Sequence, residues 1–80
     1  MDFRLKVFYT VANRLSFTKA ATELFITQPA ISKHIQELEE KYKIKLFDRT
    51  GNKISLTQAG LLLLSHTNKI FEIYRDIDFD

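Results

Sequence analysis

Cysteine and tryptophan are both missing from this 80-residue chain, which holds one proline and two glycines. Without cysteine, neither a disulfide nor a thiolate-bound metal can support the fold. A chain of this length buries only about 60% of the surface that it exposes when unfolded, so its core is thin. Stability therefore has to come from packing in one small domain or from a partner chain, and dimerisation is an expectation.

A long hydrophobic run is missing as well. No stretch reaches the ~20 apolar residues that span a bilayer. The first ten residues, MDFRLKVFYT, carry charges in the region that a signal peptide keeps apolar. We therefore expect a cytoplasmic protein without a membrane segment.

The charge is small overall but unevenly distributed. The net charge of +2 is too small to indicate what kind of partner the chain binds. Residues 41–53 hold five basic side chains and one acidic one, whereas residues 72–80 hold four acidic and one basic. One end of the chain is therefore basic and the other acidic.

The spacing of apolar residues predicts the order α-α-α-β-β-α, a mainly α fold. Asp2 caps a first helix that ends near Asn13 or Arg14, with a buried stripe of Leu5, Phe8, Ala12 and Leu15. A short second helix, TKAATEL, is capped by Ser16 or Thr18 and buries Ala20, Ala21 and Leu24.

The third predicted helix covers about residues 28–41 and begins in the sequence TQPAISKHI. Thr27 serves as its N-cap, and Pro29 lies in the first turn, where a missing N–H costs nothing. The expected buried stripe is Ile31, Ile35, Leu38 and Tyr42. This stripe leaves a front on the opposite side of the helix, which is formed by Gln28, Pro29, Ser32, Lys33 and Gln36.

Alternation with a period of two then predicts a β-hairpin over about residues 44–56. Ile44 and Leu46 form one inward set, Ile54 and Leu56 the other, and the chain turns at Gly51-Asn52. The outer face is basic. Thr57 then caps a fourth helix of roughly 20 residues, ~30 Å long, which exceeds what so small a core covers.

The second and third helices fit the helix-turn-helix arrangement. Ala21 lets the helices cross closely, and Leu24 and Ile26 anchor the turn. Phe25 takes the turn position where glycine is common, at a cost of about 1 kcal/mol. The exposed front of the third helix suits DNA, because Gln28 can pair with a base edge and Lys33 with guanine.

Two longer stretches of the sequence resemble a known family. LSFTKAATELFITQPAISKHIQELE and KLFDRTGNKISLTQAG resemble the N-terminal DNA-binding domain of LysR-type transcriptional regulators, over nearly all 80 residues. The resemblance implies a winged helix-turn-helix at residues 1–57 and a linker helix at 58–80 that pairs two subunits antiparallel. This chain differs from the family pattern at Lys43, where the family usually has glycine.

The resemblance also implies function. A homodimer would bind a pseudo-palindromic site in double-stranded DNA, with no cofactor. The family continues into an effector-binding domain, so we expect this chain to stop within the linker helix and the small-molecule effector to act through a domain absent from it. The positions matching DNA contacts are Ser16, Thr18, Lys19, Thr27, Gln28, Pro29, Ala30, Ser32, Lys33, Arg49 and Lys53.

A seam on the fourth helix is the expected dimer surface. Its residues alternate steps of four and three, as in a coiled coil. They are Leu63, Thr67, Ile70, Tyr74 and Ile77, with Phe71 beside them. Packing on the same domain would account for residues 61–64, but it would not account for residues 70–77 farther along the axis.

Several alternatives stay open. Arg49 could contact phosphate or pair with Glu39 to hold the wing on the third helix. The lysines at 41, 43 and 45 could merely solubilise the chain. Winged-helix folds also serve as protein-interaction adaptors, and the exposed seam could bind a foreign helix.

An enzyme or a metal site is not expected. His34 and His66 are the only histidines and have no third ligand type near them. The carboxylates of Glu37, Glu39 and Glu40 would point in different directions on a helix, with no pocket around them.

Overall fold

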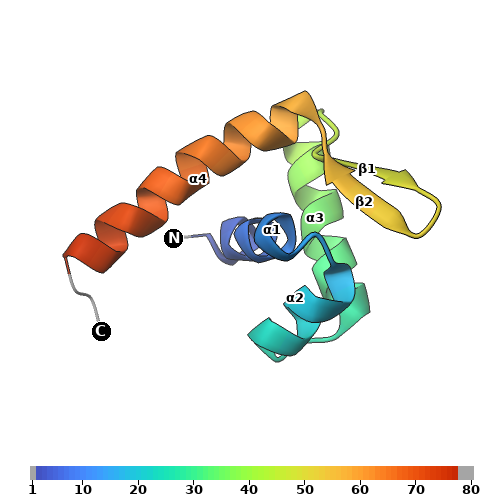
Figure 1. Ribbon diagram of the computed structural model, residues 1–80, viewed down its shortest axis with the longest axis horizontal. Coiled ribbons are helices and arrows are strands. Elements are labelled where there is room, and N and C mark those ends of the chain that lie inside the picture. The colour runs from blue at the N-terminus through green and yellow to red at the C-terminus, as the bar shows by residue number, and fades with distance from the viewer. Residues whose placement is uncertain (1, 78–80) are drawn as a thin grey trace.

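A computed structural model describes residues 2–77 of the chain and has the predicted order of elements (Figure 1). The elements are α1 (Phe3–Arg14), α2 (Phe17–Leu24), α3 (Gln28–Tyr42), β1 (Phe47–Thr50), β2 (Lys53–Leu56) and α4 (Gln58–Asp76). The first three helices pack together, the hairpin projects to one side, and α4 runs away from it to the other side. The mainly α winged helix-turn-helix is therefore confirmed. Asp78 and Asp80, part of the predicted acidic end, lie outside the described residues.

Side-chain caps start all four helices, from Asp2, Ser16, Thr27 and Thr57. The hydroxyl of Ser16 accepts a hydrogen bond from the Lys19 amide at 3.0 Å, so Ser16 rather than Thr18 is the cap of α2. Each cap satisfies an amide that has no partner inside its helix. The starts of the helices are thus determined locally.

Left-handed residues end the first three helices. Leu15, Phe25 and Lys43 have φ angles of 51°, 58° and 57°. For Phe25 and Lys43 this confirms the expectation that a side chain occupies a position favouring glycine, at about 1–2 kcal/mol each. The prediction that Leu15 belongs to the buried stripe of the first helix is wrong. Its positive φ turns the chain out of the helix, and the residue is 49% exposed.

The core lies among α1, α2, α3 and the start of the hairpin. Val7, Phe8 and Val11 of α1 are completely buried, as is Ile31 of α3, while Ile35 and Leu38 are almost so. The predicted stripe on α3 is confirmed as far as Leu38. Tyr42 does not continue it, because the helix ends at this residue and Lys43 redirects the chain, which leaves the tyrosine half-exposed.

The hairpin is shorter than predicted at its start. The first strand was expected to include Ile44 and Leu46, but it begins at Phe47. One carboxylate oxygen of Glu39 accepts hydrogen bonds from the amides of Leu46 at 2.8 Å and Phe47 at 3.5 Å. The Ile44 amide likewise donates to the Glu39 carbonyl. Residues 43–46 are therefore held by α3 rather than by a strand.

The predicted turn of the hairpin is confirmed. The strands pair antiparallel, from Phe47 opposite Leu56 to Thr50 opposite Lys53, which leaves a two-residue turn. Gly51 has a φ of +62° there, a conformation that glycine adopts without steric cost. In the part of the chain that is described, no helix is both long and apolar enough to cross a membrane.

Candidate nucleic-acid interface

The front of α3 projects from the domain because the opposite side of this helix is anchored. Ile31 is completely buried and Ile35 is 4% exposed. The side chains of Gln28, Pro29 and Lys33 are exposed, and Ala30 and Ser32 are half-buried. Thr27 directs its hydroxyl back to the Ala30 amide at 3.2 Å, so it acts as the cap of the helix.

A groove brings the start of α2, the start of α3 and the hairpin together. It has a volume of about 340 Å³. Four of the predicted DNA contacts line it: Ser16, Thr18, Gln28 and Arg49. These residues are separated by up to 33 positions in the sequence, from Ser16 to Arg49. The tertiary structure thus joins the three segments that sequence analysis proposed separately.

A second groove of about 330 Å³ continues along α3 and includes Ser32 from the predicted set. Arg49 lines this groove as well as the first. Its guanidinium carbon lies 4.4 Å from the centre of the Phe17 ring, a cation–π contact. Arg49 is therefore a charged side chain at which the two grooves meet.

The alternative that Arg49 pairs with Glu39 is wrong for the described residues 2–77. The carboxylate of Glu39 is engaged by the backbone amides of Leu46 and Phe47. No ion pair joins it to Arg49 within this range. Glu39 does hold the start of the hairpin on α3, but through backbone donors rather than through the arginine.

The remaining predicted positions line neither groove; they are Lys19, Thr27, Pro29, Ala30, Lys33 and Lys53. Lys19 is exposed on the first turn of α2, and Lys53 is exposed at the first residue of β2, next to the hairpin turn. Other residues outside the predicted contact set also line the grooves, among them Phe17, Gln36 and Asn52. Gln36 follows Ser32 by one helical turn, which was a usable signal. No such signal existed for Phe17, because a buried aromatic residue is usually interpreted as part of the core.

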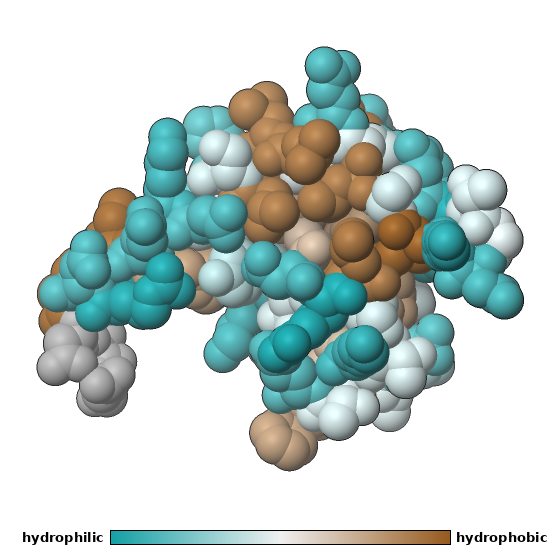
Figure 2. Space-filling view, viewed as in Figure 1, coloured by the Kyte–Doolittle hydropathy of each residue, from teal (hydrophilic) through white to brown (hydrophobic). Residues whose placement is uncertain are grey.

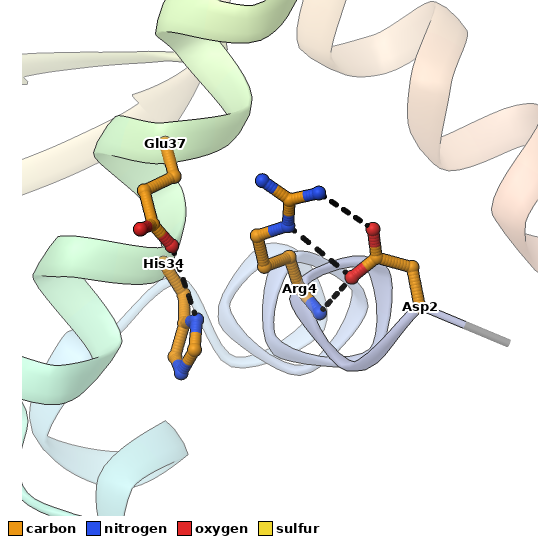
Figure 3. Close-up of polar contacts among 4 residues, drawn as sticks. All are labelled: Asp2, Arg4, His34 and Glu37. Atoms are coloured by element: carbon orange, nitrogen blue, oxygen red, sulfur yellow. Dashed lines mark hydrogen bonds and ion pairs between the residues drawn. The ribbon is translucent and has the colours of Figure 1, made fainter.

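The opposite side of α3 rests on the start of α1 (Figure 3). His34 meets the Phe3 ring edge-on, with ring centroids 5.4 Å apart. Its Nδ1 lies 3.6 Å from a carboxylate oxygen of Glu37. Beside them, Arg4 forms an ion pair with Asp2 at 2.9 Å. The side-chain hydrogen bond from Arg4 lowers the pKa of Asp2 from 3.8 to about 2. His34 is thus part of the support of α3.

Metal ligands do not gather anywhere in residues 2–77. No three side chains of histidine, cysteine, aspartate or glutamate lie close enough to hold an ion. Glu37 contacts His34 and Glu39 binds backbone amides, so both carboxylates have structural contacts.

The predicted dimer seam on α4 is partly packed against its own domain and partly exposed. Leu63 and Phe71 turn toward their own domain, and Phe71 stacks on Tyr9 of α1 with ring centroids 4.2 Å apart. Thr67 is completely buried, and its hydroxyl donates to the Leu63 carbonyl. Its place in a surface for a second chain is therefore wrong, because α1 covers this side of α4. Ile70 is half-buried.

Other apolar side chains of α4 are exposed instead. Tyr74 and Ile77 of the predicted seam are exposed, and so is Ile73, which was missed, at 57%. The expectation that residues 61–64 pack on their own domain is wrong for Leu61 and Leu62, which are 57% and 63% exposed. Leu62, Ile73 and Ile77 share one face of the helix, rotated from the predicted seam. Figure 2 shows hydrophobic side chains over the first turns of α4 and again at its far end.

The sequence is similar to bacterial regulators. Residues 3–61 match the family described as "Bacterial regulatory helix-turn-helix protein, lysR family". A probable RuBisCO transcriptional regulator of Thalassiosira pseudonana is 44% identical over 70 residues, which are 88% of this chain and 23% of that protein. For the HTH-type transcriptional regulator CbbR of Rhodospirillum rubrum the identity is 41% over 75 residues, 94% of this chain and 25% of CbbR. The chain thus spans about a quarter of the length of these relatives.

Solved structures agree with this similarity. A transcriptional regulator of the LysR family from Eggerthella lenta DSM 2243 superimposes with a TM-score of 0.80 at 46% identity, covering 85% of this chain and 97% of that one. A complex of the BenM DBD with catB site 1 DNA superimposes with a TM-score of 0.88 at 33% identity, covering 96% and 88%. The match thus includes a protein that was solved bound to DNA.

Proposed function

Because the chain belongs to the lysR family of bacterial regulatory helix-turn-helix proteins, we propose that it binds double-stranded DNA with sequence preference. The groove shared by α2, α3 and the hairpin carries this proposal. In it, two helix N-termini, whose free amides favour phosphate, converge with the cationic Arg49. The front of α3 would lie in the major groove, with the hairpin on the adjacent backbone or minor groove.

The residues of the interface divide by chemistry. Gln28, Ser32 and Lys33 stand on the exposed front of α3, where side-chain amide, hydroxyl and ammonium groups reach base edges. Lys19 of α2 and Arg49 and Lys53 of the hairpin would contact phosphates beside this front. The first set would confer sequence preference, and the second would confer affinity for any duplex.

We also propose that two copies bind together. Ile73 and Ile77 expose apolar side chains on the far half of α4, at the opposite end of the molecule from the hairpin (Figure 1). Pairing of two linker helices, within residues 58–80, would cover them and place two copies of α3 on a pseudo-palindromic site. Residues 1–57 would then form the DNA-binding unit.

The parent protein would be a cytoplasmic transcription regulator rather than an enzyme. The names of its relatives support this, since they describe transcriptional regulators. Because the chain spans about a quarter of those relatives, a small-molecule effector would act through a part of the protein outside these residues.

Fluorescence anisotropy tests the DNA-binding proposal. A duplex selected from a random pool would be compared with a scrambled one over a range of salt. Gln28→Ala and Ser32→Ala should reduce the preference for the selected duplex, whereas Lys53→Ala should weaken both duplexes alike. The salt slope should fall by about 0.9 with Lys53→Ala, as one phosphate contact is lost.

Lys6→Ala is the matched control, because Lys6 is an exposed cation on α1. It should leave affinity and salt slope unchanged. If the wild-type chain bound neither duplex at low salt, the proposal would be wrong. The adaptor alternative would then gain support, and light scattering would show whether the chain still forms dimers.

A further inference from the structure

Phe17 is a buried aromatic residue that lies against the one cation shared by both grooves. Its side chain is 6% exposed, and it is the first residue of α2, immediately after the Ser16 cap. The ring nevertheless lines both grooves beside Arg49. Its surroundings therefore combine a core contact on one side with the candidate interface on the other.

A row of aromatic rings holds Phe17 in place. Its ring meets Phe47 edge-on with centroids 5.9 Å apart, and Phe47 in turn packs on Phe8 at 5.5 Å. Phe8 is completely buried and Phe47 is 3% exposed. The ring of Phe17 is thus a rigid surface, because the rings behind it belong to the close-packed core.

Arg49 follows Phe47 by two residues on β1, so both side chains lie on the same face of the strand. This face turns toward α2, where the guanidinium of Arg49 lies 4.4 Å from the centre of the Phe17 ring. A guanidinium over a ring keeps its N–H donors at its edges, where an incoming anion can reach them. Within residues 2–77, Arg49 is paired with no carboxylate.

We propose that Phe17 is a positioning residue for DNA binding, which holds the guanidinium of Arg49 over its ring so that its N–H groups meet a phosphate between the two grooves. The inference rests on the proposed function. A flexible arginine loses side-chain entropy when it binds, and an arginine already held in place loses less. Phe17 would thus raise affinity without touching the DNA.

A double-mutant cycle on the 80-residue chain tests the proposal. Phe17→Leu should weaken binding to the selected duplex about fivefold, the size of an exposed cation–π contact. In an Arg49→Met background the same substitution should cost almost no further affinity, because the cation it positions is gone. Phe17→Tyr keeps the ring and should bind like the wild type.

Two controls separate positioning from a general effect on the fold. Phe8→Leu removes a ring from the same row but away from Arg49, and should lower stability while leaving the affinity of the folded protein unchanged. An equal loss from Phe17→Leu in both Arg49 backgrounds would overturn the proposal. Wild-type protein that binds no duplex would instead overturn the proposed function.

One measurement does not depend on the Phe17→Leu variant. The side-chain NMR signals of Arg49 should be shifted upfield by the ring current of Phe17 in the free protein, and Phe17→Tyr should preserve the shift. Signals at ordinary arginine positions would refute the contact, even if Phe17→Leu failed to fold.

Discussion

The groove side of the molecule and the far half of α4 expose opposite kinds of surface. On the groove side, exposed residues such as Gln28 and Arg49 are polar or charged, and caps and aromatic rings hold the elements that carry them. On the far half of α4, Ile73 and Ile77 are more than half exposed. The stack of Phe71 on Tyr9 is a contact between this half and the domain.

This difference indicates two kinds of partner. A surface with cations and helix N-termini gains most from a polyanion, whose phosphates replace bound water and counterions. An exposed row of large aliphatic side chains gains most from another apolar surface. Under the proposed function, one short chain would bind DNA at one end and a second copy at the other, and the joint between the ends would have to be rigid.

Gly60 lies at that joint, and its replacement should have the largest effect. A β-carbon there would collide with the carbonyl oxygen of Leu46 and lie 2.9 Å from a methyl carbon of Leu56. Gly60→Ala should lower the free energy of unfolding by about 3 kcal/mol, because the backbone must shift. Urea unfolding measures this.

Gly51 supplies the comparison for that measurement. It has a positive φ but open space around it, so Gly51→Asn, which tolerates this conformation, should change stability little. If Gly60→Ala and Gly51→Asn had equal stability, α4 would not be packed closely against the residues that precede the hairpin.

Removing the carboxylate of Glu39 should disturb the groove side selectively. Glu39→Ala leaves the amides of Leu46 and Phe47 without their acceptor, which should cost about 2 kcal/mol of stability and weaken DNA binding. Thermal unfolding and anisotropy would report the two effects. Glu40→Ala, on the exposed neighbour, should change neither, and identical behaviour of the two variants would contradict the role of Glu39.

A charge on the far half of α4 should break the dimer and leave the domain intact. Ile73→Asp should raise the dimer dissociation constant at least tenfold, about 1.4 kcal/mol, because an unpaired carboxylate would be buried between chains. Sedimentation equilibrium measures this. Asn68→Asp adds the same charge on the other side of the helix and should have little effect. A dimer unaffected by Ile73→Asp would exclude this face as the contact.

The smallest effect is expected at Asp2, on the side of the domain that supports α3. Asn also caps helices, so Asp2→Asn removes the charge but keeps the cap. A lowered pKa means that the ionised carboxylate stabilises the folded state above the unfolded pKa of 3.8, and that this contribution is lost as the pH falls to about 2. The difference in thermal midpoint between wild type and Asp2→Asn should therefore shrink over this range. A constant difference would show that the ion pair with Arg4 contributes nothing.

Most predictions that depended on near neighbours in the sequence were accurate. The caps Thr27 and Thr57, the two-residue turn at Gly51 and the left-handed ends at Phe25 and Lys43 were all expected. Each depends on hydrogen bonds or backbone angles within about four residues. Two predictions failed because of an element distant in the sequence: Glu39 of α3 holds the residues before β1, and Thr67 is completely buried in its own domain.

The amino-acid sequence alone determined the order of the elements, the starts of α1, α3 and α4, the hairpin turn, and the family to which the chain belongs. Tertiary structure decided which side of α4 is open, where β1 begins, and that Phe17 and Arg49 meet. The physical reason is that periodicity states which residues share a face, whereas the covering of a face depends on which element packs there. A cation and a ring 32 positions apart, at 49 and 17, come into contact only through the packing of α2 against the hairpin.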